Sequence, residues 1–154
     1  MVERVTRGNL DAENAMRSLI ASWNDNTFDG DDKWARRREV EKLCKLVADL
    51  KLQSMRSSLV ARESVSEPTL SVYVVGALSA LGDEGALGKL HHQSRHGKGV
   101  PQVLAVEMCR YLTDPESTTI VANAANSERR DLRASATKEL LTFLDRREET
   151  ARVR

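Results

Sequence analysis

A spacing of 31 residues recurs along this chain and restricts its fold more than any other feature of the sequence. An apolar residue lies two positions before Asp83, Asp114 and Asp145, and these three aspartates are 31 residues apart. Apolar positions keep the same spacing, in the sets Leu43/Val74/Ala105/Ala136, Val47/Leu78/Cys109/Leu140, Leu50/Leu81/Leu112 and Leu59/Leu90/Val121. A fixed period of this length is typical of proteins built from stacked helical units, in which each unit buries its apolar face against the next.

Within each unit, apolar residues recur every three or four positions, which indicates helices. The predicted units are three helix pairs and one closing helix, at about 37–63, 68–97, 100–127 and 129–147. Pro68, Pro101 and Pro115 are expected at helix starts, Gly82 at a helix end, and Asp83 and Asp114 as N-terminal caps. The stretch 37–62 is compatible with either one helix or two.

An additional helix is predicted at about 10–23, before the first unit. Asn9 or Asp11 can cap it, and a polar loop at 24–31 leads to Asp31 or Asp32 at the start of the next helix. We therefore expect one all-α domain over residues 1–154. It comprises an N-terminal cap helix and loop at about 10–34, repeats at 37–147 and a frayed charged tail at 148–154.

The segment 76–90, GALSALGDEGALGKL, resembles the short HEAT-like repeat of the phycobilin-lyase type. That unit has a first helix ending in Ala-Leu-Gly, a following Asp, and a second helix with Ala-Leu and a later Leu. The resemblance implies an α-solenoid of antiparallel helix pairs, a class made up mostly of binding scaffolds. It transfers no catalytic residue and no cofactor to this chain.

The charge balance favours a protein partner over nucleic acid. The chain carries 24 Lys+Arg and 23 Asp+Glu. The balance is even along it, with 12 basic and 11 acidic residues in 1–63 and 12 of each in 64–154. The triplet Arg36-Arg37-Arg38 fans around nearly a full helical turn, so we expect a solvated face there rather than a nucleic-acid track.

The remaining composition indicates a soluble cytoplasmic protein. Two cysteines are too few for a disulfide scaffold, and Cys44 and Cys109 both lie in apolar register, as buried reduced thiols do. No stretch approaches the ~20 apolar residues of a membrane helix. The first residues, MVERVTRGNLDAE, lack the apolar core of a secretory signal.

No sequence motif of an enzyme or of a metal site is complete. The chain has no Gly-x-Ser-x-Gly, no phosphate-binding glycine loop and no Cys-x-x-Cys. His92 and His96 are four residues apart and could present two imidazoles to one metal ion, but a third ligand is needed and neither cysteine supplies it. We therefore expect no cofactor and no metal, and we place His91, His92 and His96 on the polar outer face of a second helix.

The exposed face of the second helices is the candidate partner-binding surface. At the 31-residue spacing Arg62 aligns with Gln93, and His92 aligns with Asn123. With two neighbours, the predicted surface is Arg62, Lys89, His92, Gln93, His96 and Asn123. The expected function is a non-enzymatic protein-interaction scaffold or adaptor. The alternatives are a nucleic-acid binder similar to HEAT-like DNA repair glycosylases and a small antitoxin or immunity-type protein. The oligomeric state stays open.

Three of the six aromatic residues, Trp23, Phe28 and Trp34, fall within twelve positions. One interpretation is a plug in which the N-terminal helix seals the open apolar end of the first repeat. The other is an exposed anchor for a partner or for a second copy of the chain, because interaction hot spots are rich in Trp.

Overall fold

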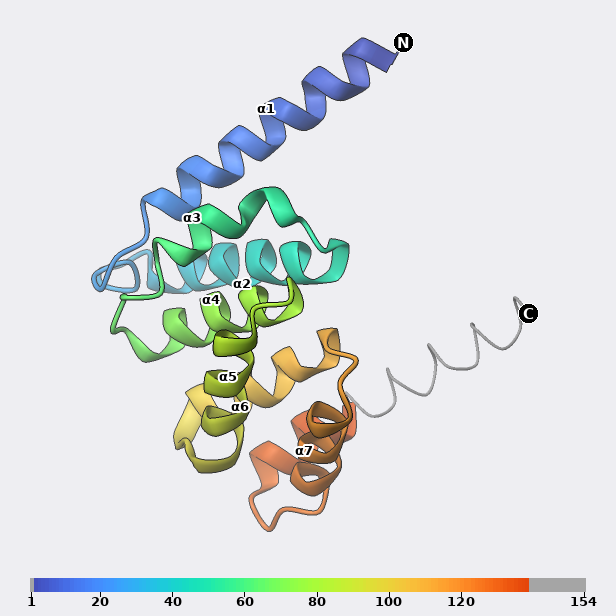
Figure 1. Cartoon of the computed structure of the whole chain (residues 1–154). Helices are drawn as coiled ribbons and strands as arrows, with labels where there is room; N and C mark the ends of the chain where they lie inside the picture. The colour runs from blue at the N-terminus through green and yellow to red at the C-terminus, as the bar shows by residue number, and fades with distance from the viewer. Residues whose placement is uncertain (1, 139–154) are drawn as a thin grey trace, which may run out of the picture.

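The computed structural model describes residues 2–138, with side chains from residue 10 onward. Over this range the chain is helical and has no strand, so the prediction of an all-α fold is confirmed (Figure 1). The end of the predicted closing helix at 139–147 and the tail at 148–154 lie outside the described residues.

The first helix, α1, spans Val2–Ala21 and is longer than predicted. Asn9 and Asp11 therefore lie inside the helix, and the prediction that either one caps it is wrong. No proline interrupts the residues before them, so the helix continues toward the N-terminus. Figure 1 shows α1 extending away from the other helices. It contacts the 3₁₀ turn η1 and helix α3, and its C-terminal end buries Ile20.

The stretch 37–62 forms more than one helix. α2 spans Lys33–Leu50 and ends at Lys51, which adopts the left-handed conformation with φ of 53°. The turn η1, Gln53–Met55, and the short helix α3, Arg56–Val60, follow. Asp32 precedes α2 but its side chain makes no capping hydrogen bond, so the prediction of a side-chain cap there is wrong.

Helices α4, Pro68–Ala80, and α5, Glu84–His96, begin and end as predicted. Pro68 occupies the first turn of α4, where its missing N–H leaves no hydrogen bond unmade. Gly82 has φ of +95° in the turn between the helices. Asp83 caps α5, because its Oδ1 accepts a hydrogen bond of 2.9 Å from the Ala86 N–H.

The C-terminal part continues with α6, Gly99–Met108, the 3₁₀ turn η2, Cys109–Tyr111, and α7, Pro115–Ala125. Residues 130–138 are again helical. Asp114 caps α7 as predicted, with its Oδ2 2.9 Å from the Ser117 N–H.

α4 lies at the centre of the packing. It contacts α2, α3, α5 and α6, and its residues from Thr69 to Ser79 are buried apart from the half-buried Ser71. Gly76 allows α6 to approach closely, because a Cβ at this position would lie 2.8 Å from Met108. α5 in turn contacts α6 and α7.

Burial follows the 31-residue spacing. The aligned sets Leu43/Val74/Ala105/Ala136, Val47/Leu78/Cys109 and Leu59/Leu90/Val121 are buried at every described position. Leu50 breaks the pattern, because it is exposed on α2 whereas Leu81 and Leu112 are buried. The cysteines are free and buried as expected, and burial raises the pKa of the Cys109 thiol to about 11.

Candidate functional site

A groove of about 630 Å³ lies between α4 and α5. This volume is in the range of pockets that take up a ligand or a side-chain cluster. One wall is mostly apolar and comes from α4 and the segment before it, with Val65, Pro68, Val72 and Val75. The opposite wall belongs to α5 and consists of Gly85, Gly88, Lys89, Leu90, His92 and Gln93.

Gly85 and Gly88 leave two positions on the α5 wall of the groove without a side chain. A Cβ built at Gly88 meets nothing within 4 Å, and one built at Gly85 meets only Asp83 Oδ1, at 3.4 Å. Glycine inside a helix costs about 1 kcal/mol relative to alanine. Packing within the chain does not require a glycine at Gly88, so its effect is to leave the groove open.

The polar rim of the groove carries positive and titratable groups. Lys89 is exposed, and its Nζ lies 4.0 Å from Glu63 Oε2. The rings of His92 and His96 have centroids 5.0 Å apart and are tilted by 48°. In the described part of the chain, no group of three or more His, Cys, Asp or Glu side chains is arranged to hold a metal ion.

The structure brings together only part of the predicted partner-binding surface. Lys89, His92 and Gln93 line the groove, and His96 lies beside His92. Asn123 is exposed but lines a separate hollow of about 210 Å³ between α5 and α7. Arg62 is half-buried, and its guanidinium donates to the backbone oxygens of Ala21, at 3.3 Å, and Trp23, at 3.0 Å.

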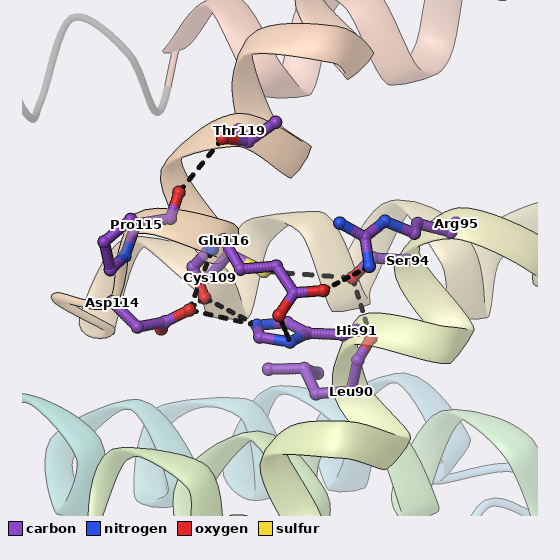
Figure 2. A network of polar contacts seen from close by, with 10 residues as sticks. Leu90, His91, Ser94, Arg95, Cys109, Asp114, Pro115, Glu116 and Thr119 are labelled. Carbon is purple, nitrogen blue, oxygen red and sulfur yellow. Dashed lines mark hydrogen bonds and ion pairs between the residues drawn. The ribbon is translucent and has the colours of Figure 1, made fainter.

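His91 is buried between α5 and α7, which corrects the prediction that it lies on the polar outer face (Figure 2). Its Nε2 is 2.9 Å from Ser117 Oγ and 3.4 Å from Asp114 Oδ2, and its Nδ1 is 3.3 Å from Glu116 Oε2. Arg95 pairs with the other oxygen of Glu116. The network therefore joins one turn of α5 to the first turn of α7.

This network holds a serine, a histidine and a carboxylate, the groups of a hydrolase triad. Ser117 Oγ donates a hydrogen bond of 2.6 Å to Asp114 Oδ1. Its exposed fraction is 0%, however, so no substrate can reach the hydroxyl. The arrangement is a polar clamp in which His91 and Ser117 are buried and Glu116 and Arg95 are exposed. The candidate site remains the groove.

The carboxylates of the clamp are acidic. Partial burial by itself would raise the pKa of Asp114. The hydrogen bonds from the Ser117 hydroxyl and N–H, together with the nearby His91, have a larger effect in the other direction, so the pKa lies below 3.8. The hydrogen bond from Arg95 is the main cause that lowers the pKa of Glu116 below 4.5. Both groups are therefore ionised at neutral pH.

Two sequence signals could have placed the clamp in the interior. His91 lies four residues after the partly buried Leu87, so the two share one face of α5. Ser117 lies 31 residues after Ala86, which is a core position. A pattern of apolar residues does not identify His91 and Ser117 as buried, because both side chains are polar.

The aromatic residues of the N-terminal region do not all fit one interpretation. Trp23 and Phe28 are covered, as a plug would be, whereas Trp34 is exposed, as an anchor would be. Trp23 is buried, with 2% of its surface exposed, and Phe28 packs against the core. The loop that carries them is held by Asp25, whose Oδ1 accepts from the N–H of Ser66 at 2.7 Å and of Glu67 at 3.1 Å. Trp34, by contrast, is 61% exposed.

Comparison with family models, curated proteins and solved structures finds no match to this chain. The HEAT-like character of the repeat therefore stays a prediction. Within the described residues, no helix combines the length and the apolar character needed to cross a membrane.

Proposed function

We propose that this chain is a non-enzymatic protein-binding module, a short α-solenoid of HEAT-like helix pairs that holds its partner in the groove between α4 and α5. The observation that carries the proposal is the groove itself. It joins an apolar wall at Val72 and Val75 to an open α5 surface at Gly88, with Lys89 and His92 at its rim.

The order of helix contacts supports the solenoid part of the proposal. α2, α4 and α6 are the first helices of successive units, and α4 contacts both of the others. The second helices of the last two pairs, α5 and α7, also contact each other. Contacts between successive units, with burial that repeats every 31 residues, are what a solenoid requires.

The mixture of groups in the groove supports a protein partner. The apolar wall can take up aliphatic or aromatic side chains, while Ser66, Ser71 and Gln93 offer hydrogen bonds to a peptide backbone. Exposed apolar surface with a polar rim is typical of interaction sites. Because Gly88 has no side chain, a partner's backbone can come close to α5.

Gly88→Ala tests the groove with effects of opposite sign on stability and on binding. The new Cβ meets no neighbour, so helix propensity should raise the free energy of unfolding by about 1 kcal/mol. The same methyl group fills part of the groove and should weaken binding. The measurements are thermal unfolding and the Kd of a partner fragment selected from a displayed library of the native proteome.

Lys89→Ala and His92→Ala should weaken the same complex without lowering Tm, because both side chains are exposed. Lys98→Ala is the matched control, since Lys98 is exposed and outside the groove. If every selected fragment binds Gly88→Ala and the wild type equally well, the groove is not the binding site and the proposal fails.

A further inference from the structure

His92 and His96 form a pair of exposed imidazole side chains near the C-terminal end of α5. They are four residues apart, so they lie on the same side of the helix. The centroids of the two rings are 5.0 Å apart, and the ring planes are tilted by 48°. A separation of four residues on a helix is the one at which the two histidines of a His-Glu-x-x-His motif hold a zinc ion.

The ring nitrogens of this pair are available to a ligand. Within residues 10–138, neither ring makes a hydrogen bond or an ion pair, and the two rings contact each other. The remaining histidine of the chain, His91, differs because it is buried and its nitrogens face Ser117 and Glu116. The nitrogen of a neutral imidazole is the commonest protein ligand of zinc and the neighbouring transition metals.

The distance between the rings fits an ion that both of them bind. A zinc ion lies about 2.1 Å from a coordinating imidazole nitrogen and therefore about 3.2 Å from the centre of that ring. Two ring centres 5.0 Å apart then subtend an angle of about 100° at the ion, which is close to the tetrahedral angle. Because both side chains are exposed, rotation about χ2 can turn one nitrogen of each ring toward the ion.

The charges around the pair are compatible with a bound cation. His96 is the last residue of α5, and the C-terminal end of a helix attracts positive charge. Lys89 and Arg95, the lysine and arginine of this helix, are paired with carboxylates. Lys89 Nζ lies 4.0 Å from Glu63 Oε2, and Arg95 pairs with Glu116. Their repulsion of an ion at the histidines is therefore reduced.

We propose that His92 and His96 together chelate one Zn²⁺ ion at the surface of α5. The two imidazoles supply half of a tetrahedral coordination, and water fills the other positions. In the part of the chain that the structure describes, no third His, Cys, Asp or Glu joins the pair, so the site is open rather than a closed structural zinc site. The missing third ligand lowers the affinity but does not prevent chelation by two. This site goes beyond the proposed protein binding and does not require a partner in the groove.

The experiment titrates the full chain, without a histidine tag, with zinc chloride and follows the imidazole resonances by NMR. We expect the ring signals of His92 and His96 to shift together and to saturate at one ion per chain, while those of the buried His91 stay in place. Cu²⁺ should bind more tightly than Zn²⁺, and Mg²⁺ should not bind, because magnesium requires oxygen ligands.

His92→Ala and His96→Ala each remove one ligand and should weaken zinc binding about 100-fold, a gain typical of linking two binding groups. Both residues are exposed, so the Tm of each variant without metal should equal that of the wild type. Lys98→Ala, which changes an exposed residue just beyond α5, is the matched control and should retain binding. The absence of saturable binding to the wild type, or zinc affinity that survives in either histidine variant, would overturn the proposal.

Discussion

At the scale of single residues, the buried polar pair His91 and Ser117 joins two helices. His91 on α5 faces Asp114, Glu116 and Ser117 on α7, and the side chain of Asp114 also caps α7. A buried polar group that loses its partner costs about 1–3 kcal/mol, so the buried His91 and Ser117 depend on each other and on Asp114. The clamp therefore orients α7 on α5 more specifically than apolar contact alone would.

The lowered pKa values of Asp114 and Glu116 predict a loss of stability in acid. A carboxyl group whose folded-state pKa is depressed stabilises the fold at pH values above its unfolded pKa, here 3.8 and 4.5. This contribution is lost as the pH falls through the lower folded-state pKa values. We expect Asp114→Asn, which retains a capping side chain, to lose less stability than the wild type when urea unfolding is compared between neutral pH and about pH 3. Parallel pH profiles would contradict the assignment.

At the scale of elements, the C-terminal end of α1 is held to the helices that follow it. Arg62, just after α3, donates to the carbonyl oxygens of Ala21, the last residue of α1, and of Trp23, just beyond it. Carbonyl groups at the C-terminal end of a helix lack a partner within the helix. Ile20 and Trp23 bury their side chains at the same place. The burial of Trp23 agrees with the interpretation of this aromatic residue as part of a covered plug, whereas the exposure of Trp34 does not.

Arg62→Met should destabilise the protein, because it keeps the aliphatic stem and removes the two hydrogen bonds to the end of α1. We expect a loss of about 1–3 kcal/mol in urea unfolding and faster hydrogen exchange at Trp23. Arg130→Met, at an exposed site, is the matched control. Unchanged stability with weakened partner binding would instead favour the prediction that Arg62 belongs to the binding surface.

At the scale of the whole molecule, α4 connects the packing. It contacts α2 and α3 before it and α5 and α6 after it, so helices distant in sequence share one core. Repeat proteins unfold unit by unit when contacts between neighbouring units are weak. Here the central helix is buried around its circumference, which predicts a single cooperative transition.

Leu78→Ala tests this cooperativity. Leu78 is fully buried on α4, so truncation should cost about 2–5 kcal/mol. The loss should appear equally in far-UV circular dichroism, which reports on all helices, and in tryptophan fluorescence. The fluorescence is measured in a Trp34→Phe background, so that it reports on Trp23 at the N-terminal end of the core. Separate transitions for the two probes would show that the units unfold independently.

Most helix boundaries and core positions could be predicted from the sequence because they depend on local rules. Pro68, Asp83 and Asp114 act through their own turn, and the 31-residue spacing identifies buried positions such as Val74 and Ala105. The candidate site was predicted only in part. Lys89, His92 and Gln93 line the groove, but the groove exists only because Val72 and Val75 of α4 face them.

The sequence by itself determined the all-α class, the order of the helices and the apolar positions that repeat every 31 residues, because propensity, capping and periodicity act over a few turns of chain. Only the tertiary structure decided that His91 is buried, that Arg62 holds α1 and that Trp23 is covered while Trp34 is exposed. These outcomes depend on which side chains of distant helices meet. The repeat spacing specifies which positions correspond between units, whereas packing between units decides which of them reach solvent.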